Sequence, residues 1–131
     1  MDRKQIGRIG LVKAIEYFTI QGYTVSIPMN DTQWYDLIVE KNGRFYTVQC
    51  KATATEDGTI DLRGTGGTRG TVYDHTLEHN IDFLFCVDKD LNCFNIPVKE
   101  TELQPNRRSI QLRIKPNMNH QGFESYKYLI S

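Results

Sequence analysis

Apolar residues recur at spacings of three and four along residues 4–21, and this pattern predicts an amphipathic helix. Gly22 follows directly, as expected where a helix ends at a glycine. From residue 23 onward the apolar residues come in short runs, several of which alternate with polar residues, as is typical of β-strands. The chain is therefore expected to begin with one helix and to continue mainly as strands.

Two of the expected strands are joined by a tight turn. Residues 34–40 (WYDLIVE) and 44–52 (RFYTVQCKA) flank Asn42-Gly43, and an Asn-Gly pair between two such runs indicates a β-hairpin. A short helix is expected over 73–80. The other expected strands cover residues 23–28, 58–64, 81–87, 92–98 and 109–115. This order of elements predicts the α/β fold class, with helices flanking one mixed β-sheet.

The length and composition indicate a single domain over residues 1–131. Such a chain is long enough to bury about two thirds of its unfolded surface. Sixteen Lys and Arg residues balance sixteen Asp and Glu residues, which argues against a strongly basic nucleic-acid-binding surface but allows local basic clusters. The three cysteines, Cys50, Cys86 and Cys93, form no CxxC pair, so neither a disulfide framework nor a zinc ribbon is expected.

The sequence shows neither a signal peptide nor a membrane span. The first ten residues, MDRKQIGRIG, lack the apolar core of a signal peptide, and no run reaches the ~18 apolar residues of a membrane helix. We therefore expect a cytoplasmic protein that does not bind a membrane.

The predicted hairpin brings three polar residues together. Side chains alternate between the two faces of a strand, so Gln49 and Lys51 share one face. Strand pairing sets Asp36 beside them, in a D-x12-Q-x-K arrangement. A carboxylate and an amide oxygen are ligands for a hard divalent cation, and a neighbouring ammonium group could position or deprotonate an attacking water. The alternative is a solvated sheet face, on which such residues are common.

The stretch GRIGLVKAIEYFTIQGYTVSIPMNDTQWYDLIVEKNGRFYTVQCKA resembles the PD-(D/E)xK nuclease superfamily, in particular its small homing endonucleases and Holliday junction resolvases. The resemblance covers residues 4–98 and implies a single-domain, restriction-endonuclease-like core. It implies that Asp36 is the catalytic aspartate and binds metal, that Gln49 replaces the usual acidic residue as a second metal ligand, and that Lys51 is the catalytic lysine.

The same resemblance implies a cofactor and partners. The cofactor would be Mg²⁺ (or Mn²⁺), and the substrate would be double-stranded or branched DNA. Because the small members present two active sites to two strands, a homodimer or homotetramer is expected. A phage or mobile-element origin would fit the resemblance.

One position departs from the pattern of these nucleases. Their first helix usually carries a metal-binding glutamate after a glycine, and the matching residue here is Leu11, after Gly10. Glu16 lies about 140° further around the helix, which makes it a poor substitute. Three functions therefore stay open. One is a metal-dependent endodeoxyribonuclease, and another is a catalytically silent relative that binds nucleic acid or inhibits a protein partner. The third is a structural or assembly protein that reuses the fold.

Arginine residues outside the trio are candidates for contacts with the DNA backbone. Arg63 and Arg69 flank the glycines of the loop 64–70 (GTGGTRG), and Arg107 and Arg108 precede the last expected strand. Neutralisation of phosphates by such side chains dominates non-specific DNA affinity. The alternatives are a mobile loop over 64–70 and, at Arg107 and Arg108, an oligomer interface or a solvated edge that discourages strand pairing.

Overall fold

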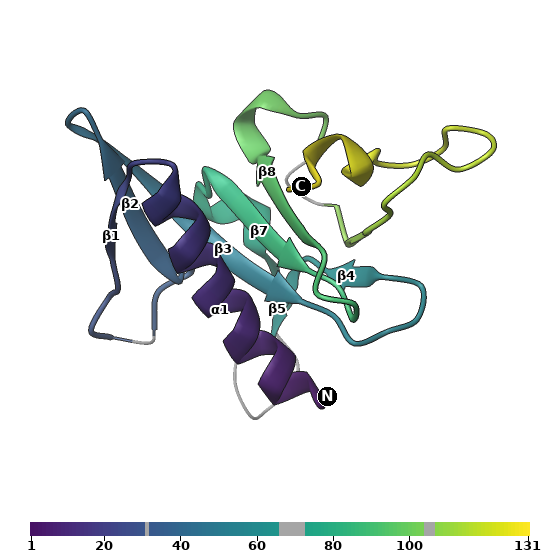
Figure 1. Cartoon of the computed structure of the whole chain (residues 1–131), viewed down its shortest axis with the longest axis horizontal. Helices are drawn as coiled ribbons and strands as arrows, with labels where there is room; N and C mark the ends of the chain where they lie inside the picture. The colour runs from purple at the N-terminus through teal and green to yellow at the C-terminus, as the bar shows by residue number, and fades with distance from the viewer. Residues whose placement is uncertain (31, 66–72, 104–106) are drawn as a thin grey trace.

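The centre of the molecule is a five-stranded mixed sheet in the order β1-β2-β3-β7-β8. The computed structural model describes residues 1–30, 32–65, 73–103 and 107–131 (Figure 1). β3 and β7 are parallel, whereas the other neighbouring strands are antiparallel. The sheet strands are β1 (Thr24–Ser26), β2 (Leu37–Lys41), β3 (Arg44–Ala52), β7 (Phe83–Val87) and β8 (Cys93–Pro97).

Helix α1 (Arg3–Ile20) packs on one face of this sheet (Figure 1). It begins with a capping box, in which the Asp2 carboxylate accepts a hydrogen bond from the Gln5 backbone N–H (2.8 Å) and the Gln5 side chain accepts one from the Asp2 N–H (3.0 Å). Its buried residues recur along one side of the helix: Ile6, Gly10, Ala14 and Phe18. A Cβ on Gly10 would lie 3.4 Å from the Val87 side chain, so the glycine permits close contact between helix and sheet.

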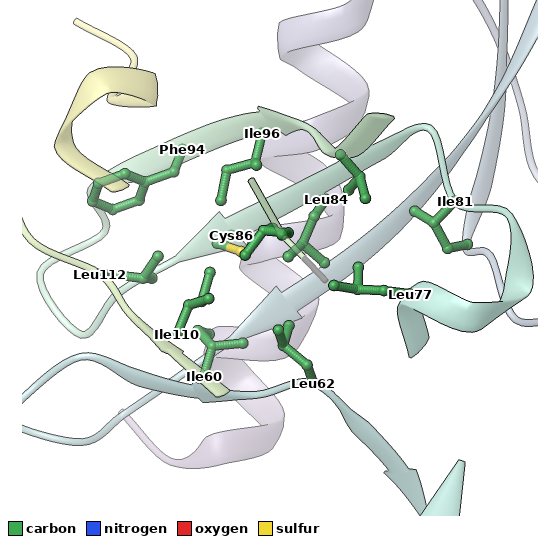
Figure 2. Close-up of a cluster of buried hydrophobic side chains, with 12 residues drawn as sticks. Ile60, Leu62, Leu77, Ile81, Leu84, Cys86, Phe94, Ile96, Ile110 and Leu112 are labelled. Atoms are coloured by element: carbon green, nitrogen blue, oxygen red, sulfur yellow. The ribbon is translucent and has the colours of Figure 1, made fainter. Parts of the chain in front are cut away.

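Two short ribbons lie outside the main sheet. β4 (Thr59–Asp61) pairs with β9 (Ser109–Gln111), and β5 (Arg63–Thr65) pairs with β6 (Tyr73–His75). Figure 2 shows the apolar side chains of the first ribbon pointing toward those of β7 and β8. The buried cluster between them includes Ile60, Leu62, Leu84, Cys86, Phe94, Ile96, Ile110 and Leu112. The sheet therefore has one apolar core beneath α1 and another beneath the β4–β9 ribbon.

The end of the chain packs against β8. Three 3₁₀ helices occur in the described residues: η2 (Thr76–His79), η3 (Val98–Glu100) and η4 (Ser125–Tyr128). Leu129, just after η4, bridges to Phe94, and the Ile130 N–H donates to the Cys93 carbonyl oxygen (2.8 Å).

The predicted fold class and hairpin are confirmed. Lys41 pairs with Arg44 across a two-residue turn, in which Asn42 and Gly43 have φ of +54° and +81°. This is the left-handed backbone that an Asn-Gly turn adopts readily. The turn therefore fixes which residues of the two strands face each other.

Two predicted elements were wrong in kind or extent. The strand expected over 58–64 is interrupted at Leu62, because the Asp61 carboxylate accepts a hydrogen bond from the Arg63 backbone N–H (2.8 Å) and turns the chain. The helix expected over 73–80 is β6 followed by a single 3₁₀ turn. A segment this short forms too few helical hydrogen bonds to compensate for the entropy lost when the first turn of an α-helix forms.

The last predicted strand is also shorter than expected. It was expected over 109–115 but pairs only as far as Gln111. Beyond that point the Leu112 N–H donates to the Gly58 carbonyl oxygen (2.8 Å), and the Arg113 N–H donates to the Ser125 hydroxyl (2.8 Å). The strand ends where its backbone takes these other partners.

The expectations drawn from composition were tested in part. Cys50, Cys86 and Cys93 are free thiols, and the residue opposite Cys93 in the β7–β8 pair is Val87. No helix in the described ranges is long and apolar enough to cross a membrane.

Gly58 offers a test of the approach between the loop before β4 and the segment after β9. Its φ is +75°, and an added Cβ would lie 2.5 Å from the Leu112 carbonyl oxygen. We expect Gly58→Ala to lower the free energy of unfolding by about 2–4 kcal/mol, because backbone strain and a clash with backbone act together.

Gly122→Ala is the matched control for this prediction. Gly122 has a φ of +74°, but within the described part of the chain nothing lies within 4 Å of its added Cβ. Its loss should reflect strain alone, about 1 kcal/mol. Urea denaturation measures both losses, and equal losses would contradict the close approach at Gly58.

Candidate functional site

Asp36 lies immediately before β2 and is held against β3. Leu37 pairs with Val48, and the Asp36 N–H donates to the Val48 carbonyl oxygen (2.8 Å), so pairing extends one residue beyond the strand. The Asp36 Oδ2 atom accepts hydrogen bonds from the Cys50 backbone N–H (2.7 Å) and from Gln49 Nε2 (3.1 Å). Backbone and side-chain bonds together fix this carboxylate.

Gln49 turns its amide nitrogen toward two acceptors. Nε2 donates to Asp36 Oδ2 and, at 3.4 Å, to the Cys50 carbonyl oxygen. Since both partners can only accept, the nitrogen and not the oxygen must face them. Among the described residues, no donor bonds to the Gln49 Oε1 or the Asp36 Oδ1 atom. Two oxygen atoms suited to a hard cation therefore remain for another ligand.

Lys51 follows on the same face of β3 and lies next to Cys86 of β7 in the strand register. This face is the one that the β4–β9 ribbon covers, and Lys51 is partly buried there. Burial lowers the pKa of Lys51, and the negative charges of Asp61 and Asp36 oppose that shift. A lysine with a lowered pKa is better suited to exchange a proton than a fully hydrated one.

Asp36 is shifted in the opposite direction. Burial raises the pKa of Asp36, while the Cys50 N–H and the charge of Lys51 act to lower it. Burial thus disfavours the charged forms of both Asp36 and Lys51. Neighbouring groups with perturbed pKa values are typical of functional sites.

A second carboxylate, which the sequence analysis did not identify, belongs to this region. Asp61 ends β4 and lines a cleft of about 700 Å³ together with Lys51, Arg3 and Arg63. The Arg63 guanidinium donates to Asp61 through Nε (3.1 Å) and Nη2 (3.2 Å). Asp61 reaches this place because β4 pairs with β9, a strand from near the end of the chain. No local pattern in the sequence could have placed it there.

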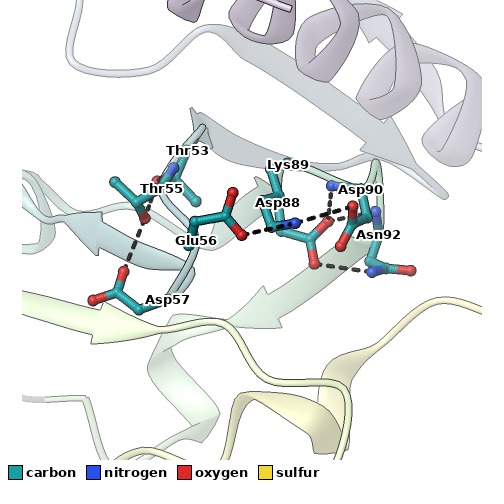
Figure 3. A network of polar contacts seen from close by, with 8 residues as sticks. All are labelled: Thr53, Thr55, Glu56, Asp57, Asp88, Lys89, Asp90 and Asn92. Atoms are coloured by element: carbon teal, nitrogen blue, oxygen red, sulfur yellow. Dashed lines mark hydrogen bonds and ion pairs between the residues drawn. The ribbon is translucent and has the colours of Figure 1, made fainter.

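One wall of the cleft is formed by Thr53, Ala54 and Thr55, the first residues of the loop 53–57 that follows β3. The Thr53 N–H donates to the Val87 carbonyl oxygen (3.0 Å), and the Thr55 hydroxyl donates to Asp57 (2.9 Å). Figure 3 shows the ion pair between Glu56 and Lys89 (3.2 Å), which ties the loop to the β7–β8 turn. These bonds hold the wall in place beside Lys51.

The first helix brings no carboxylate to the cleft. Leu11 packs against the apolar core between α1 and the sheet. Glu16 lines a different groove, together with Cys93 and Ile130. Glu16 therefore does not reach the cleft and cannot replace the helix glutamate that the resemblance in the sequence leads one to expect.

The predicted DNA-binding arginines fall in different places. Arg63 lines the same cleft as Lys51. Arg107 borders a smaller cleft of about 290 Å³ beside β9, and Thr59 lines both clefts. Arg108 lies between Arg107 and β9, where its carbonyl oxygen accepts from the Leu62 N–H (2.8 Å). Arg69 lies outside the described residues.

Comparison with known families gives this arrangement a context. A family model described as PD-(D/E)XK endonuclease matches residues 1–128. The chain belongs to the PD-(D/E)XK endonuclease family. A solved structure with the same fold is the bacterial homing endonuclease I-Ssp6803I. It matches with a TM-score of 0.75 and 22% sequence identity over 98% of this chain and 89% of that one. A comparison with curated proteins found no match.

PD-(D/E)XK nucleases generally use divalent metal ions. Within the described ranges, no group of three or more His, Cys, Asp or Glu residues is placed to hold a metal. The oxygen atoms left over on Asp36 and Gln49 nevertheless fit the donor chemistry of such an ion. A site here would draw on amide oxygen as well as carboxylate.

The raised pKa of Asp36 predicts an effect on stability. A carboxyl group whose pKa is higher in the folded than in the unfolded state destabilises the fold when ionised, and this penalty is relieved as pH falls through the raised value. We expect Asp36→Asn to be more resistant to urea than the unmodified protein at pH 7. The difference should shrink as the pH is lowered toward the ordinary pKa of an aspartate.

The same substitution at Asp90, an exposed residue of the β7–β8 turn, provides the control. The asparagine at position 36 can still accept the Cys50 N–H, and Gln49 can rotate its amide to match. A loss of stability in Asp36→Asn at pH 7 would show that the hydrogen bonds of the carboxylate outweigh its burial.

Proposed function

We propose that this protein is an endodeoxyribonuclease that hydrolyses phosphodiester bonds of DNA with the help of Mg²⁺ or Mn²⁺. The observation that carries the proposal is the contact of Asp36 with Gln49, with Lys51 on the same face at the edge of a cleft. Membership of the PD-(D/E)XK endonuclease family supports the reaction class. The homing endonuclease relationship supports DNA as the substrate only by analogy of fold.

Each residue of the trio has a role that its surroundings favour. Asp36 and Gln49 would hold the metal through carboxylate and amide oxygen. Such an ion supplies Lewis acidity and lowers the pKa of water. Lys51 would position the attacking water and stabilise negative charge on the phosphate, tasks that suit an ammonium group with partly removed hydration.

We propose that the arginines around the cleft bind the DNA substrate. Arg63 and Arg3 would contact the DNA backbone beside the trio, and Arg107 and Arg108 would extend this contact along β9. Arg69 stays a candidate of the same kind. A single domain over residues 1–131 and a homodimer or homotetramer that cuts double-stranded or branched DNA are parts of the same proposal.

Leu11 favours a second candidate function. Without a carboxylate from α1, the chain could keep the nuclease fold and act by binding nucleic acid or a protein partner. This candidate makes the opposite prediction about metal dependence, because a binder needs no divalent ion.

The deciding experiment is cleavage of supercoiled plasmid and of branched DNA by the purified protein. We expect nicking with Mg²⁺ or Mn²⁺, none in EDTA, and a loss of at least about 100-fold in rate in Lys51→Met, because the ammonium acts on the reacting groups. Methionine keeps most of the side-chain volume, so that the apolar core beside Cys86 stays filled.

Lys99→Met is the matched control for this experiment. Lys99 is exposed, pairs with Asp82 (2.9 Å) and lies in η3, after β8, so its removal should leave cleavage unchanged. Absence of cleavage by the folded, unmodified protein on both substrates would favour the silent binder. Equal activity in Lys51→Met and the unmodified protein would remove Lys51 from the mechanism.

The proposed backbone contact at β9 has its own test. We expect Arg108→Gln to weaken binding of a non-cleaved duplex in EDTA and to reduce the slope of log K against log salt by about one, because one phosphate contact is lost. Arg44→Gln, at the exposed first residue of β3, should leave the slope unchanged. Fluorescence anisotropy over a salt series measures both, and equal slopes would exclude Arg108 from the interface.

A further inference from the structure

The smaller cleft beside β9 contains two arginines and, among its described lining residues, no acidic side chain. Arg107 and Arg113 line this cleft, whose volume is about 290 Å³. Its other polar lining residues are exposed: Thr59, Ser109, Gln111 and Gln121. Hydroxyl and amide groups around two guanidinium groups suit an anion that carries several acceptor oxygens.

The guanidinium of Arg113 is held by one of its nitrogens, while the other two are buried without a partner. Nη2 donates to the carbonyl oxygens of Phe123 (2.8 Å) and Gln121 (3.2 Å). Within the described part of the chain, Nε and Nη1 make no hydrogen bond, although both are shielded from solvent. A buried cation is costly where neither water nor a carboxylate balances its charge. Arg113 therefore presents a poorly compensated positive charge at this cleft.

The acidic residue that follows Phe123 does not supply this compensation. Glu124 lines a different cleft. Its carboxylate pairs there with Lys127 and lies 3.5 Å from His120 Nδ1. The charge of Glu124 is thus directed to the opposite side of the segment that carries it.

The exposed face of the β4–β9 ribbon connects this cleft with the cleft beside Lys51. Thr59 pairs with Gln111, and Asp61 pairs with Ser109. All four are exposed, because the residue between them on each strand points into the apolar cluster. Thr59 lines both clefts. The two clefts, each lined by arginines, are therefore joined by a polar surface.

We propose that Arg113 and Arg107 form a second site for a backbone phosphate of DNA, so that a DNA strand engaged beside Lys51 continues across the β4–β9 ribbon. This inference rests on the DNA substrate of the proposed function and adds a residue and a path to it. The phosphate would bring the negative charge that the described surroundings of Arg113 lack. Because that guanidinium is partly buried, water screens its attraction for a phosphate less than it would at an open surface.

The competing role for Arg113 is that of a brace for the segment 113–125. Its backbone N–H donates to the Ser125 hydroxyl (2.8 Å), which in turn donates to the Gln111 carbonyl oxygen (2.8 Å). Ser125→Ala removes both of these bonds and keeps the guanidinium. It should lower the stability of the fold and leave DNA affinity unchanged, whereas a brace would require both to fall together.

The first measurement is binding of a duplex in EDTA, followed by fluorescence anisotropy over a salt series. We expect Arg113→Gln to weaken binding several-fold at low salt and to reduce the slope of log K against log salt by about one, because one phosphate contact is lost. Arg113→Lys, which keeps the charge, should retain most of the slope. If Arg113→Gln does not fold, as judged by circular dichroism, Arg107→Gln carries the test with the same expected change.

The second measurement follows the Nε–H signal of Arg113 by nuclear magnetic resonance, with the signal assigned by its absence in Arg113→Lys. We expect the duplex to shift this signal in the unmodified protein. Inorganic phosphate should shift it only at much higher concentration, because a single phosphate lacks the contacts at the other cleft.

Four outcomes would overturn the inference. The first is an unchanged salt slope in the folded Arg113 or Arg107 variant, and the second is an equal loss of affinity in Ser125→Ala. The third is a shift of the Arg113 signal with inorganic phosphate but not with the duplex, which would indicate a site for a small anion. The fourth is the absence of duplex binding by the unmodified protein.

These measurements are independent of hydrolysis, because EDTA is present throughout. Unchanged slopes together with metal-dependent cleavage would reject the second phosphate site and keep the nuclease. The expected loss of slope without any cleavage would keep the site and favour the catalytically silent DNA binder. Failure of the inference and failure of the proposed function therefore give different results.

Discussion

The antiparallel register of β2 and β3 is the constraint on which the candidate site depends. Leu37 faces Val48, and both are buried beneath α1. The alternate residues, Asp36, Gln49 and Lys51, must then face the other side of the sheet. A slip of one residue would bring charged groups beneath the helix and expose the apolar ones. The packing of α1 thus fixes the chemistry of the opposite face.

That opposite face is not an open surface, and this changes how the trio is understood. The β4–β9 ribbon covers it with an apolar cluster, and Lys51 lies at the edge of this cluster beside Cys86. On a fully solvated face, water would stabilise the lysine and the pKa of Lys51 would not be lowered by burial. The surroundings of Asp36 and Lys51 therefore speak against the simple alternative of a solvated sheet face.

The sequence carried the information for the hairpin but not for the ribbon. Asn42-Gly43 and the alternation on either side of it determine which residues of β2 and β3 meet, and these are local signals. Asp61 depends on long-range pairing of β4 with β9 and on the break in the chain that its own bond to the Arg63 N–H creates. Those contacts join segments far apart in sequence, so no short pattern records them. The first helix was informative in a different way. Leu11 stands where the resemblance to PD-(D/E)xK nucleases implies a glutamate, so the sequence alone showed that this carboxylate is absent.

The distribution of charge reconciles a neutral protein with a nucleic-acid substrate. The chain has equal numbers of acidic and basic residues, yet Arg3, Lys51 and Arg63 line the cleft with Asp61 as the acidic residue among its described lining residues. A divalent cation would meet net repulsion there until a negatively charged ligand arrives. DNA phosphates would reverse this balance, and they would do so where Asp36 and Gln49 still have oxygen atoms to offer. Under the proposed function, a cleft with this charge would bind a divalent ion weakly until DNA is present, and hydrolysis would then be limited to the complex with DNA.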